Sequence, residues 1–145
     1  MINIYVKAGT LKGSSTVSII LKSQKYRWTK TFLINQNLPN NSFTKSVTLD
    51  ALGMLFALKH IKNRYRKKKV VVYSDSGHIK SALKVKDDEY INKTKIQVIE
   101  NLRDTIGTFS NLSVQDFSEK CEYKEELEHM FIECALDKIE IDEKD

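Results

Sequence analysis

An aspartate stands at the end of a continuous apolar run. Residues 70–73 read Val-Val-Val-Tyr, and Ser74, Asp75 and Ser76 follow directly. A run of β-branched and aromatic residues without polar alternation predicts a strand that is buried on both faces. Ligands of α/β sheets gather at the carboxyl ends of central strands, which makes Asp75 a candidate site residue. The competing interpretation is a turn and N-cap that start a helix at His78.

A second aspartate interrupts the apolar face of a predicted helix. Apolar residues recur at spacings of three and four from Val47 to Ile61, and Asp50 falls on the same stripe. A buried carboxylate there must meet a cation, a hydrogen-bond donor or water. The alternative is that Asp50 belongs to the first turn of the helix and interacts with its dipole.

Cations crowd the segment between this helix and the apolar strand. They are Lys62, Arg64, Arg66, Lys67, Lys68 and Lys69. Such a cluster can bind the phosphate backbone of a nucleic acid, and Trp28 would offer a ring on which a base could stack. The competing interpretation is a solvated connection that keeps the strand edge soluble.

The elements that must position these residues follow from hydrophobic periodicity. We expect strands at 2–7, 17–21, 27–34, 70–74 and 112–117, turns at 9–15 and 24–25, and helices from Val47 to about 61 and at 78–84, 94–106 and 123–139. Three strands joined by short turns form an antiparallel meander. A meander followed by alternating helices and strands predicts an α/β fold, a mixed five-stranded sheet flanked by helices.

Length and composition restrict the class of protein. A chain of 145 residues predicts one domain, 1–145, with an acidic tail at about 140–145. The net charge of +5 favours an anionic partner. Two cysteines are too few for a disulfide scaffold, and no apolar segment approaches the ~18 residues of a membrane span. With no secretion signal at its amino terminus, the chain is expected to be cytoplasmic, without a membrane partner.

The order of the elements and two local patterns resemble the ribonuclease H family. Residues 71–76, Val-Val-Tyr-Ser-Asp-Ser, are similar to the family's fourth strand, an apolar run followed by Thr-Asp-Ser. Asp50, with Ala57 and Leu58 after it, reproduces the family's spacing between the acid of the first long helix and Ala-Leu, with Asp in place of Glu. The resemblance implies a ribonuclease H-like fold that acts on RNA–DNA hybrids or RNA.

The first strand and the last helix depart from the family's pattern. Residues 5–9, Tyr-Val-Lys-Ala-Gly, occupy the place of the family's aromatic-x-Asp-Gly-Ser, so Lys7 stands where the strand Asp should be. In the last helix, Glu133 comes four residues after His129 and fits the family's Asn-x-x-x-Asp. Asp137 lies nearer the predicted apolar stripe, and both acids remain candidates.

The resembled chemistry is hydrolysis of a phosphodiester by two Mg²⁺ ions held about 4 Å apart by carboxylates. In that family the first-strand Asp contacts both metals. Lys7 removes this ligand and adds a positive charge. We therefore expect Lys7 to be the internal counter-ion of Asp50 and Asp75 in place of a metal cofactor.

Three functions are compatible with these residues. The first is a ribonuclease H-like protein with impaired catalysis that binds nucleic acid or a protein that handles nucleic acid. The second is an active Mg²⁺- or Mn²⁺-dependent ribonuclease on RNA–DNA hybrids, with Asp50, Asp75 and Glu133 or Asp137 as catalytic residues and Asp50 and Asp75 as metal ligands. The third is a protein-interaction module on the same fold, such as an inhibitor or an antitoxin-like partner. Whether the protein is an enzyme stays open at this point.

Overall fold

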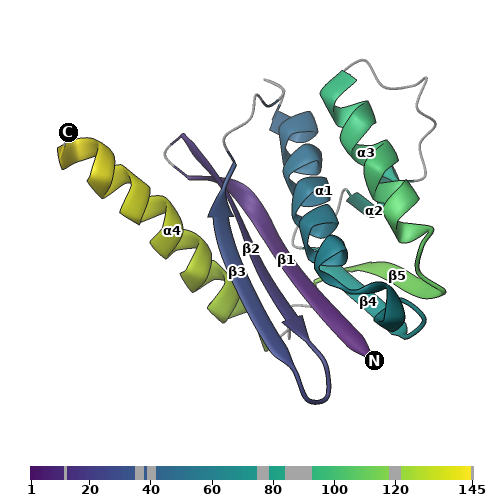
Figure 1. Cartoon of the computed structure of the whole chain (residues 1–145). Coiled ribbons are helices and arrows are strands. Elements are labelled where there is room, and N and C mark those ends of the chain that lie inside the picture. The colour runs from purple at the N-terminus through teal and green to yellow at the C-terminus, as the bar shows by residue number, and fades with distance from the viewer. Residues whose placement is uncertain are drawn as a thin grey trace.

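A mixed sheet carries helices on both faces in the computed structural model (Figure 1). The structure describes residues 1–11, 13–34, 38, 42–74, 79–83, 93–117 and 122–144. The elements in chain order are β1 (Ile2–Leu11), β2 (Ser14–Lys22), β3 (Arg27–Leu33), α1 (Ser42–His60), the short 3₁₀ helix η1 (Asn63–Tyr65), β4 (Lys69–Ser74), α2 (Ile79–Ala82), α3 (Lys93–Ile106), β5 (Asn111–Asp116) and α4 (Lys124–Lys144). None of the helices in these ranges is long and apolar enough to span a membrane.

The strand order in the sheet is β3-β2-β1-β4-β5. Strands β1, β2 and β3 form the antiparallel meander, whereas β4 pairs in parallel with both β1 and β5. The predicted five-stranded mixed sheet is therefore confirmed. Its central strand is β1, and the parallel pair β1–β4 places the carboxyl ends of both strands at the same edge of the sheet.

Three element boundaries differ from the predictions. The turn expected at 9–15 is shorter, because β1 and β2 stay paired as far as Leu11 and Ser14 and turn near Gly13, whose φ is 83°. Helix α1 begins at Ser42 rather than Val47. Few apolar side chains fall in the turn segment and in Ser-Phe-Thr-Lys-Ser at the start of α1, so the hydrophobic signal is weak although a strand ladder and a first helical turn form there. Helix α4 continues to Lys144, beyond its predicted end at 139.

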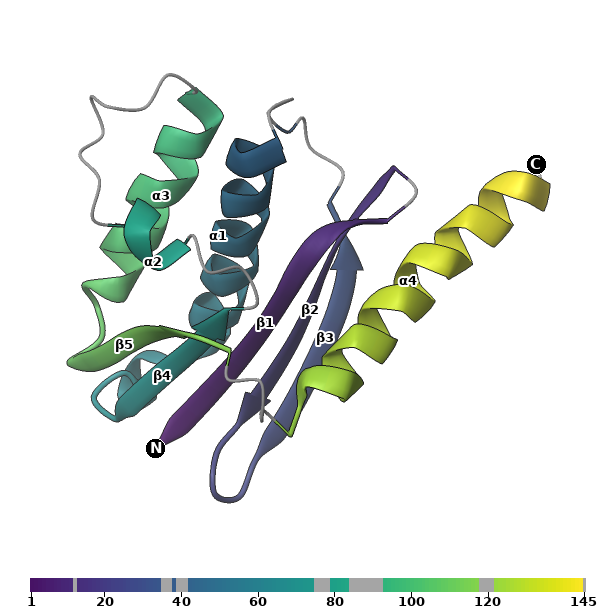
Figure 2. The same cartoon turned by 180° about the vertical axis from the view of Figure 1, so that it is seen from behind.

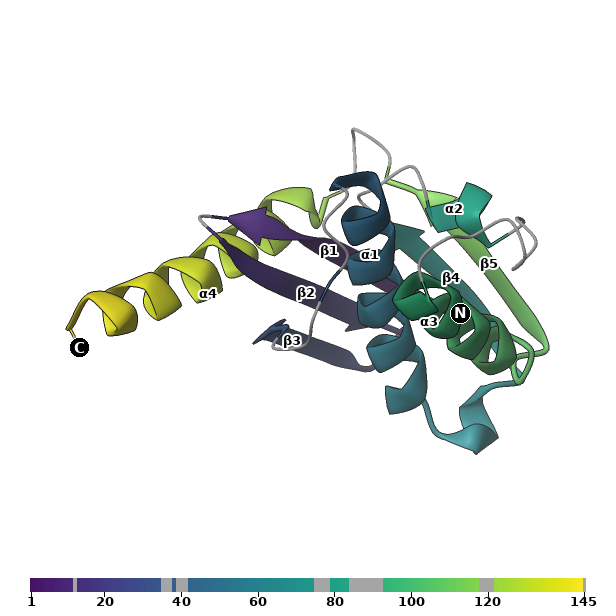
Figure 3. The same ribbon diagram turned by 90° about the horizontal axis from the view of Figure 1, so that it is seen from above.

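The two faces of the sheet are covered by different helices. Figure 3 shows α1 and α3 on one face and α4 on the other, and Figure 2 shows α4 from its own side. Along β1, the even-numbered Ile2, Ile4 and Val6 belong to the main hydrophobic core beneath α1. The odd-numbered Tyr5 packs instead against Tyr123, next to the start of α4, with a centroid distance of 4.7 Å and the rings tilted by 48°. The alternation of the strand thus divides its side chains between two layers.

Helix α1 packs closely on the sheet at Gly53. A Cβ atom on this residue would lie 2.8 Å from a methyl group of Val6 and 2.8 Å from one of Val17. Glycine inside a helix costs about 1 kcal/mol relative to alanine. The close packing that glycine permits is the physical reason for its presence in α1, and it fixes which turn of the helix lies over β1.

Replacing Gly53 by alanine tests this packing. Despite the better helix propensity of alanine, we expect Gly53→Ala to lower the free energy of unfolding by about 1–3 kcal/mol, because the added methyl overpacks the helix–sheet contact. Urea denaturation measures the change. Gly9→Ala is the matched control, since its Cβ would meet Phe131 at an ordinary 3.5 Å. Equal stability of the two variants would contradict this packing.

Candidate functional site

The described part of the parallel ladder between β1 and β4 extends to the pair Val6–Ser74. The Ser74 residue is completely buried, and Lys7 is the next residue along β1. Asp75 follows Ser74 in the sequence but lies outside the described residues. The predicted site should nevertheless lie beside this pair, because Lys7 directly follows Val6 and Asp75 directly follows Ser74.

Asp50 lies in the third turn of α1, eight residues beyond Ser42. The first turn of α1 carries no acidic residue, so the interpretation of Asp50 as a helix N-terminal charge is wrong. Its side chain is 0% exposed, between the core residues Val47 and Met54. The prediction that Asp50 lies on the buried stripe is confirmed.

Asp50 also lies toward the same end of the sheet as Lys7. Helix α1 runs antiparallel to β1 (Figure 1), and Gly53 contacts Val6. Asp50 is almost one turn nearer the start of α1, which places it farther along β1 than Val6. The helix therefore positions this buried carboxylate near the carboxyl ends of β1 and β4.

Lys7 is half-buried on the opposite face of β1 from the main core. Its ammonium lies 5.3 Å from the centroid of the Phe131 ring of α4, within the range of a cation–π interaction. Lys7 also lines a small hollow with Phe117, Leu127 and Glu128. Its role as counter-ion of Asp50 and Asp75 stays a prediction, because Asp75 is not among the described residues.

Glu133, one of the two predicted acids of the last helix, does not line this hollow. The Glu133 side chain is 64% exposed, and its Oε1 atom lies 3.0 Å from Nε2 of His129, one turn earlier on α4. The side chain of Asp137 lies outside the described residues. Glu128, which the sequence interpretation missed, is the α4 acid beside Lys7. The signal that could have found Glu128 is its place in the first turns of the helix, directly after the buried Leu127.

The described donors do not fit a two-metal centre. Within the described parts of the chain, no three side chains of His, Cys, Asp or Glu gather closely enough to hold a metal ion. Asp50 is buried, Glu133 faces solvent on the helix that covers the other side of the sheet, and an ammonium occupies the β1 position. A cation on the central strand is the opposite of what a divalent metal requires from its ligands.

The basic segment lies at the other end of the sheet. It follows the last turn of α1, includes η1 and enters the first residue of β4 (Figure 1). Arg66 differs from its neighbours because its guanidinium donates to the Ile61 carbonyl at 3.0 Å and to the Thr108 hydroxyl at 2.7 Å. Arg66 therefore ties the segment to the loop before β5. The exposed members are Lys62, Arg64, Lys67, Lys68 and Lys69.

The half-buried Trp28 already stacks on another side chain of the protein. Its indole ring lies 3.9 Å from the imidazole of His60 with an interplanar angle of 12°, and 6.2 Å from the ring of Phe56. One face of the indole is thus occupied by His60. The prediction that Trp28 stacks on a base stays untested. The exposed tyrosine rings near the basic segment are those of Tyr26 and Tyr65.

Comparison with known proteins shows the fold. No family model and no curated protein matches the sequence. Among solved structures, LC11-RNase H1, isolated from compost by a metagenomic approach, superposes with a TM-score of 0.71 at 14% identity over 95% of this chain and 97% of that one. LC11-RNase H1 in complex with an RNA/DNA hybrid gives a TM-score of 0.65 at 12% identity over 96% and 99%. RNase H1 from the halophilic archaeon Halobacterium salinarum gives 0.62 at 14% identity over 94% and 98%. The fold is therefore ribonuclease H-like, as predicted.

A double-mutant cycle tests the predicted pairing of Lys7 with the buried acid. We expect Lys7→Met and Asp50→Asn each to change the free energy of unfolding, and the double variant to deviate from additivity by at least about 1 kcal/mol. The physical reason is that Asp50 is buried, so a variant that lacks its counter-ion would leave that carboxylate uncompensated. Urea denaturation at neutral pH measures all four proteins.

The control cycle replaces Asp50→Asn by Glu128→Gln. Glu128 is exposed, so its coupling to Lys7 should stay below about 0.5 kcal/mol. Additive effects of Lys7→Met and Asp50→Asn would rule out a direct electrostatic link between them.

Proposed function

We propose that this protein binds nucleic acid on a ribonuclease H-like fold and has little or no nuclease activity. The observation that carries the proposal is the place of Lys7 in the fold. The residue stands on the central strand directly after the last described pair of the β1–β4 ladder, where the resembled family has its metal-binding Asp. The ribonuclease H-like fold supports this alignment, in which Lys7 reverses the charge of the family's Asp.

The energetic consequence of Lys7 favours a metal-free site. An ammonium and a carboxylate about 4 Å apart attract each other by about 4 kcal/mol at an effective dielectric constant of about 20. An amine on β1 that lies near Asp75 or Asp50 would oppose Mg²⁺ binding by its own charge and would satisfy the acids without a metal. Catalysis that depends on Mg²⁺ or Mn²⁺ would then lose both a ligand and the negative potential that attracts the ion.

Binding can persist without the acidic site because the exposed cations lie elsewhere. Lys67, Lys68 and Lys69 form an uninterrupted cationic run at the start of β4, and all three are exposed. Phosphate contacts of this kind supply most of the affinity of non-specific nucleic-acid binding. An RNA–DNA hybrid or RNA is the ligand class that we propose, by analogy with the hybrid complex of LC11-RNase H1. A protein that handles nucleic acid is the alternative partner.

Hydrolysis of an RNA–DNA hybrid tests the impaired site. We expect the natural chain to show no turnover above background in Mg²⁺ or Mn²⁺, and Lys7→Asp to raise the rate by at least about tenfold, a gain of roughly 1.4 kcal/mol in transition-state stabilisation. Lys7→Met is the matched control, because it removes the charge without supplying a ligand. Robust turnover by the natural chain would contradict the proposal and favour the active ribonuclease.

A salt titration of binding tests the cationic run. Replacing Lys67, Lys68 and Lys69 together by alanine should weaken binding to a labelled RNA–DNA hybrid and reduce the slope of log K against log salt by about 2–3, since each phosphate contact contributes about 0.9 for B-form DNA. Fluorescence anisotropy measures both quantities. The control is the exposed triple Lys25, Lys30 and Lys124 replaced by alanine.

Two outcomes would overturn the assigned surface or ligand. Equal losses in the two triple variants would show that binding depends on net charge alone. No binding of hybrid or RNA by the natural chain would leave a protein partner, which a pull-down that survives nuclease treatment would detect.

A further inference from the structure

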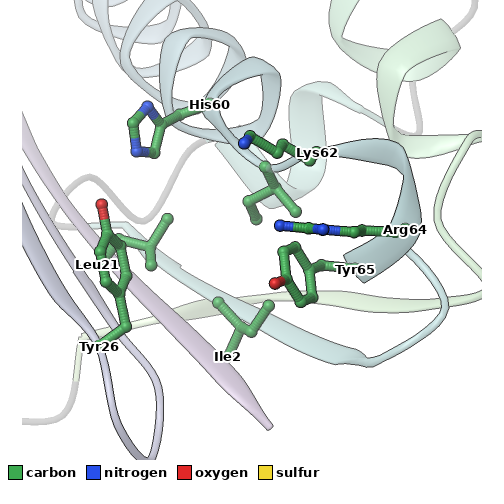
Figure 4. Close-up of a pocket in the computed structure, with 8 residues that line it drawn as sticks. Ile2, Leu21, Tyr26, His60, Lys62, Arg64 and Tyr65 are labelled. Atoms are coloured by element: carbon green, nitrogen blue, oxygen red, sulfur yellow. The ribbon is translucent and has the colours of Figure 1, made fainter.

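A pocket of about 400 Å³ opens at the end of the sheet that carries the basic segment (Figure 4). It lies among the start of β1, the β2–β3 hairpin, the last turn of α1 and η1. Small-molecule sites in proteins have volumes of about 300–1,000 Å³, so the pocket is large enough for a ligand of the size of a nucleotide.

The floor of the pocket is apolar and rigid. Ile2, Leu21 and Ile61 line it and are only 6%, 3% and 5% exposed. They belong to the hydrophobic core between the sheet and α1. Such a floor can contact the flat apolar face of a ligand but offers no hydrogen bonds to its polar groups.

Two tyrosine rings form the side walls. Figure 4 shows Tyr26, from the β2–β3 hairpin, facing Tyr65, from η1, across the pocket. These rings remain 51% and 39% exposed, so their surface is accessible to a ligand. The guanidinium carbon of Arg64 lies 4.8 Å from the centroid of the Tyr65 ring, which gives this wall a second planar group. Bases stack well on tyrosine rings and on guanidinium planes.

The rim of the pocket is cationic. Lys62 and Arg64 are exposed at its mouth, next to His60. None of the described residues that line the pocket is acidic. A phosphate group held beside the walls would therefore meet two full positive charges and no opposing carboxylate, and an arginine can bind it through two parallel hydrogen bonds.

We propose that this pocket binds a nucleotide. The base lies between Tyr26 and the wall made by Tyr65 and Arg64, against the apolar floor, and the phosphate lies at Lys62 and Arg64. The two aromatic walls favour a flat ring over an aliphatic chain. The cations favour a ligand that carries a phosphate over a neutral ligand. A nucleotide requires this combination of features in one cavity, whereas a solvated loop would not provide it.

The nucleotide can come from two sources, a free mononucleotide or the terminal nucleotide of a strand. The inference stands apart from the proposed function, because the pocket is far from Lys7 and Asp50 and needs no metal and no hybrid. The two proposals share Lys62 and Arg64, whereas Tyr26 belongs to the pocket alone. Their failures can therefore be told apart.

Titration of the natural chain with AMP tests the pocket. Isothermal calorimetry gives the affinity, and the fluorescence of Trp28, the only tryptophan, gives a local signal because its ring stacks on His60, which lines the pocket. We expect AMP to bind at least about tenfold more tightly than adenosine, which lacks the phosphate, and than inorganic phosphate, which lacks the base. A 5′-phosphorylated oligoadenylate forms the second arm, and tighter binding of that probe would identify a strand end as the source.

Variants of the walls and the rim complete the test. We expect Tyr26→Ala, and separately Lys62→Ala with Arg64→Ala, to weaken AMP or oligoadenylate binding at least about tenfold. Lys30→Ala removes an exposed cation outside the pocket and should leave binding unchanged. Thermal unfolding checks that each variant is folded, and Tyr26→Phe should retain the affinity. The inference would be overturned if neither probe bound, if inorganic phosphate bound as tightly as AMP, or if Tyr26→Ala bound like the natural chain.

Discussion

The contact between Gly53 and the strands beneath it determines where the chemistry of this protein can lie. The missing side chain lets α1 approach Val6 and Val17, and a shift of one residue would turn the helix by about 100° and carry Asp50 out of the buried stripe. The same contact sets the helix along β1, so that Asp50 lies toward the end of the β1–β4 ladder. A single packing constraint thus places a buried carboxylate at the edge of the sheet where strand residues Lys7 and Ser74 also lie.

The parallel pairing of β1 and β4 separates two regions of opposite chemistry. Carboxyl ends of both strands meet at one edge, and amino ends meet at the other, beside the basic segment and the pocket. Strand β4 runs from Lys69 to Ser74, a span of about 17–20 Å. This distance exceeds the Debye length of about 8 Å at physiological salt. The cations of residues 62–69 are therefore largely screened from the end of the sheet that carries Asp50 and Lys7, and the two ends can be altered independently.

The sequence predicted what periodicity controls and missed what tertiary contacts create. Alternation and helical spacing report burial directly, which is why the sheet and the stripe that includes Asp50 were predicted correctly. The start of α1 at Ser42 was missed because its first five residues, Ser-Phe-Thr-Lys-Ser, carry a single apolar side chain and so show no helical periodicity. Arg66 looked like its cationic neighbours until its hydrogen bonds to Ile61 and Thr108 were seen. The pocket could not be predicted, since its walls and floor come from segments separated along the chain and meet only in the fold.

The position of Lys7 explains how an amine can serve a site on a strand whose alternation points it away from the core. Beyond the Val6–Ser74 pair, β1 continues beside β2, and no described residue of β4 flanks it. A lysine carries its charge on a flexible four-carbon stem, whereas the side chain of an aspartate is short. The ammonium lies 5.3 Å from the centroid of the Phe131 ring, so Lys7 contributes to the contact between the sheet and α4. A lysine at this strand position therefore places a positive charge on the central strand while it also packs against α4, and the ribonuclease H-like fold accommodates it there.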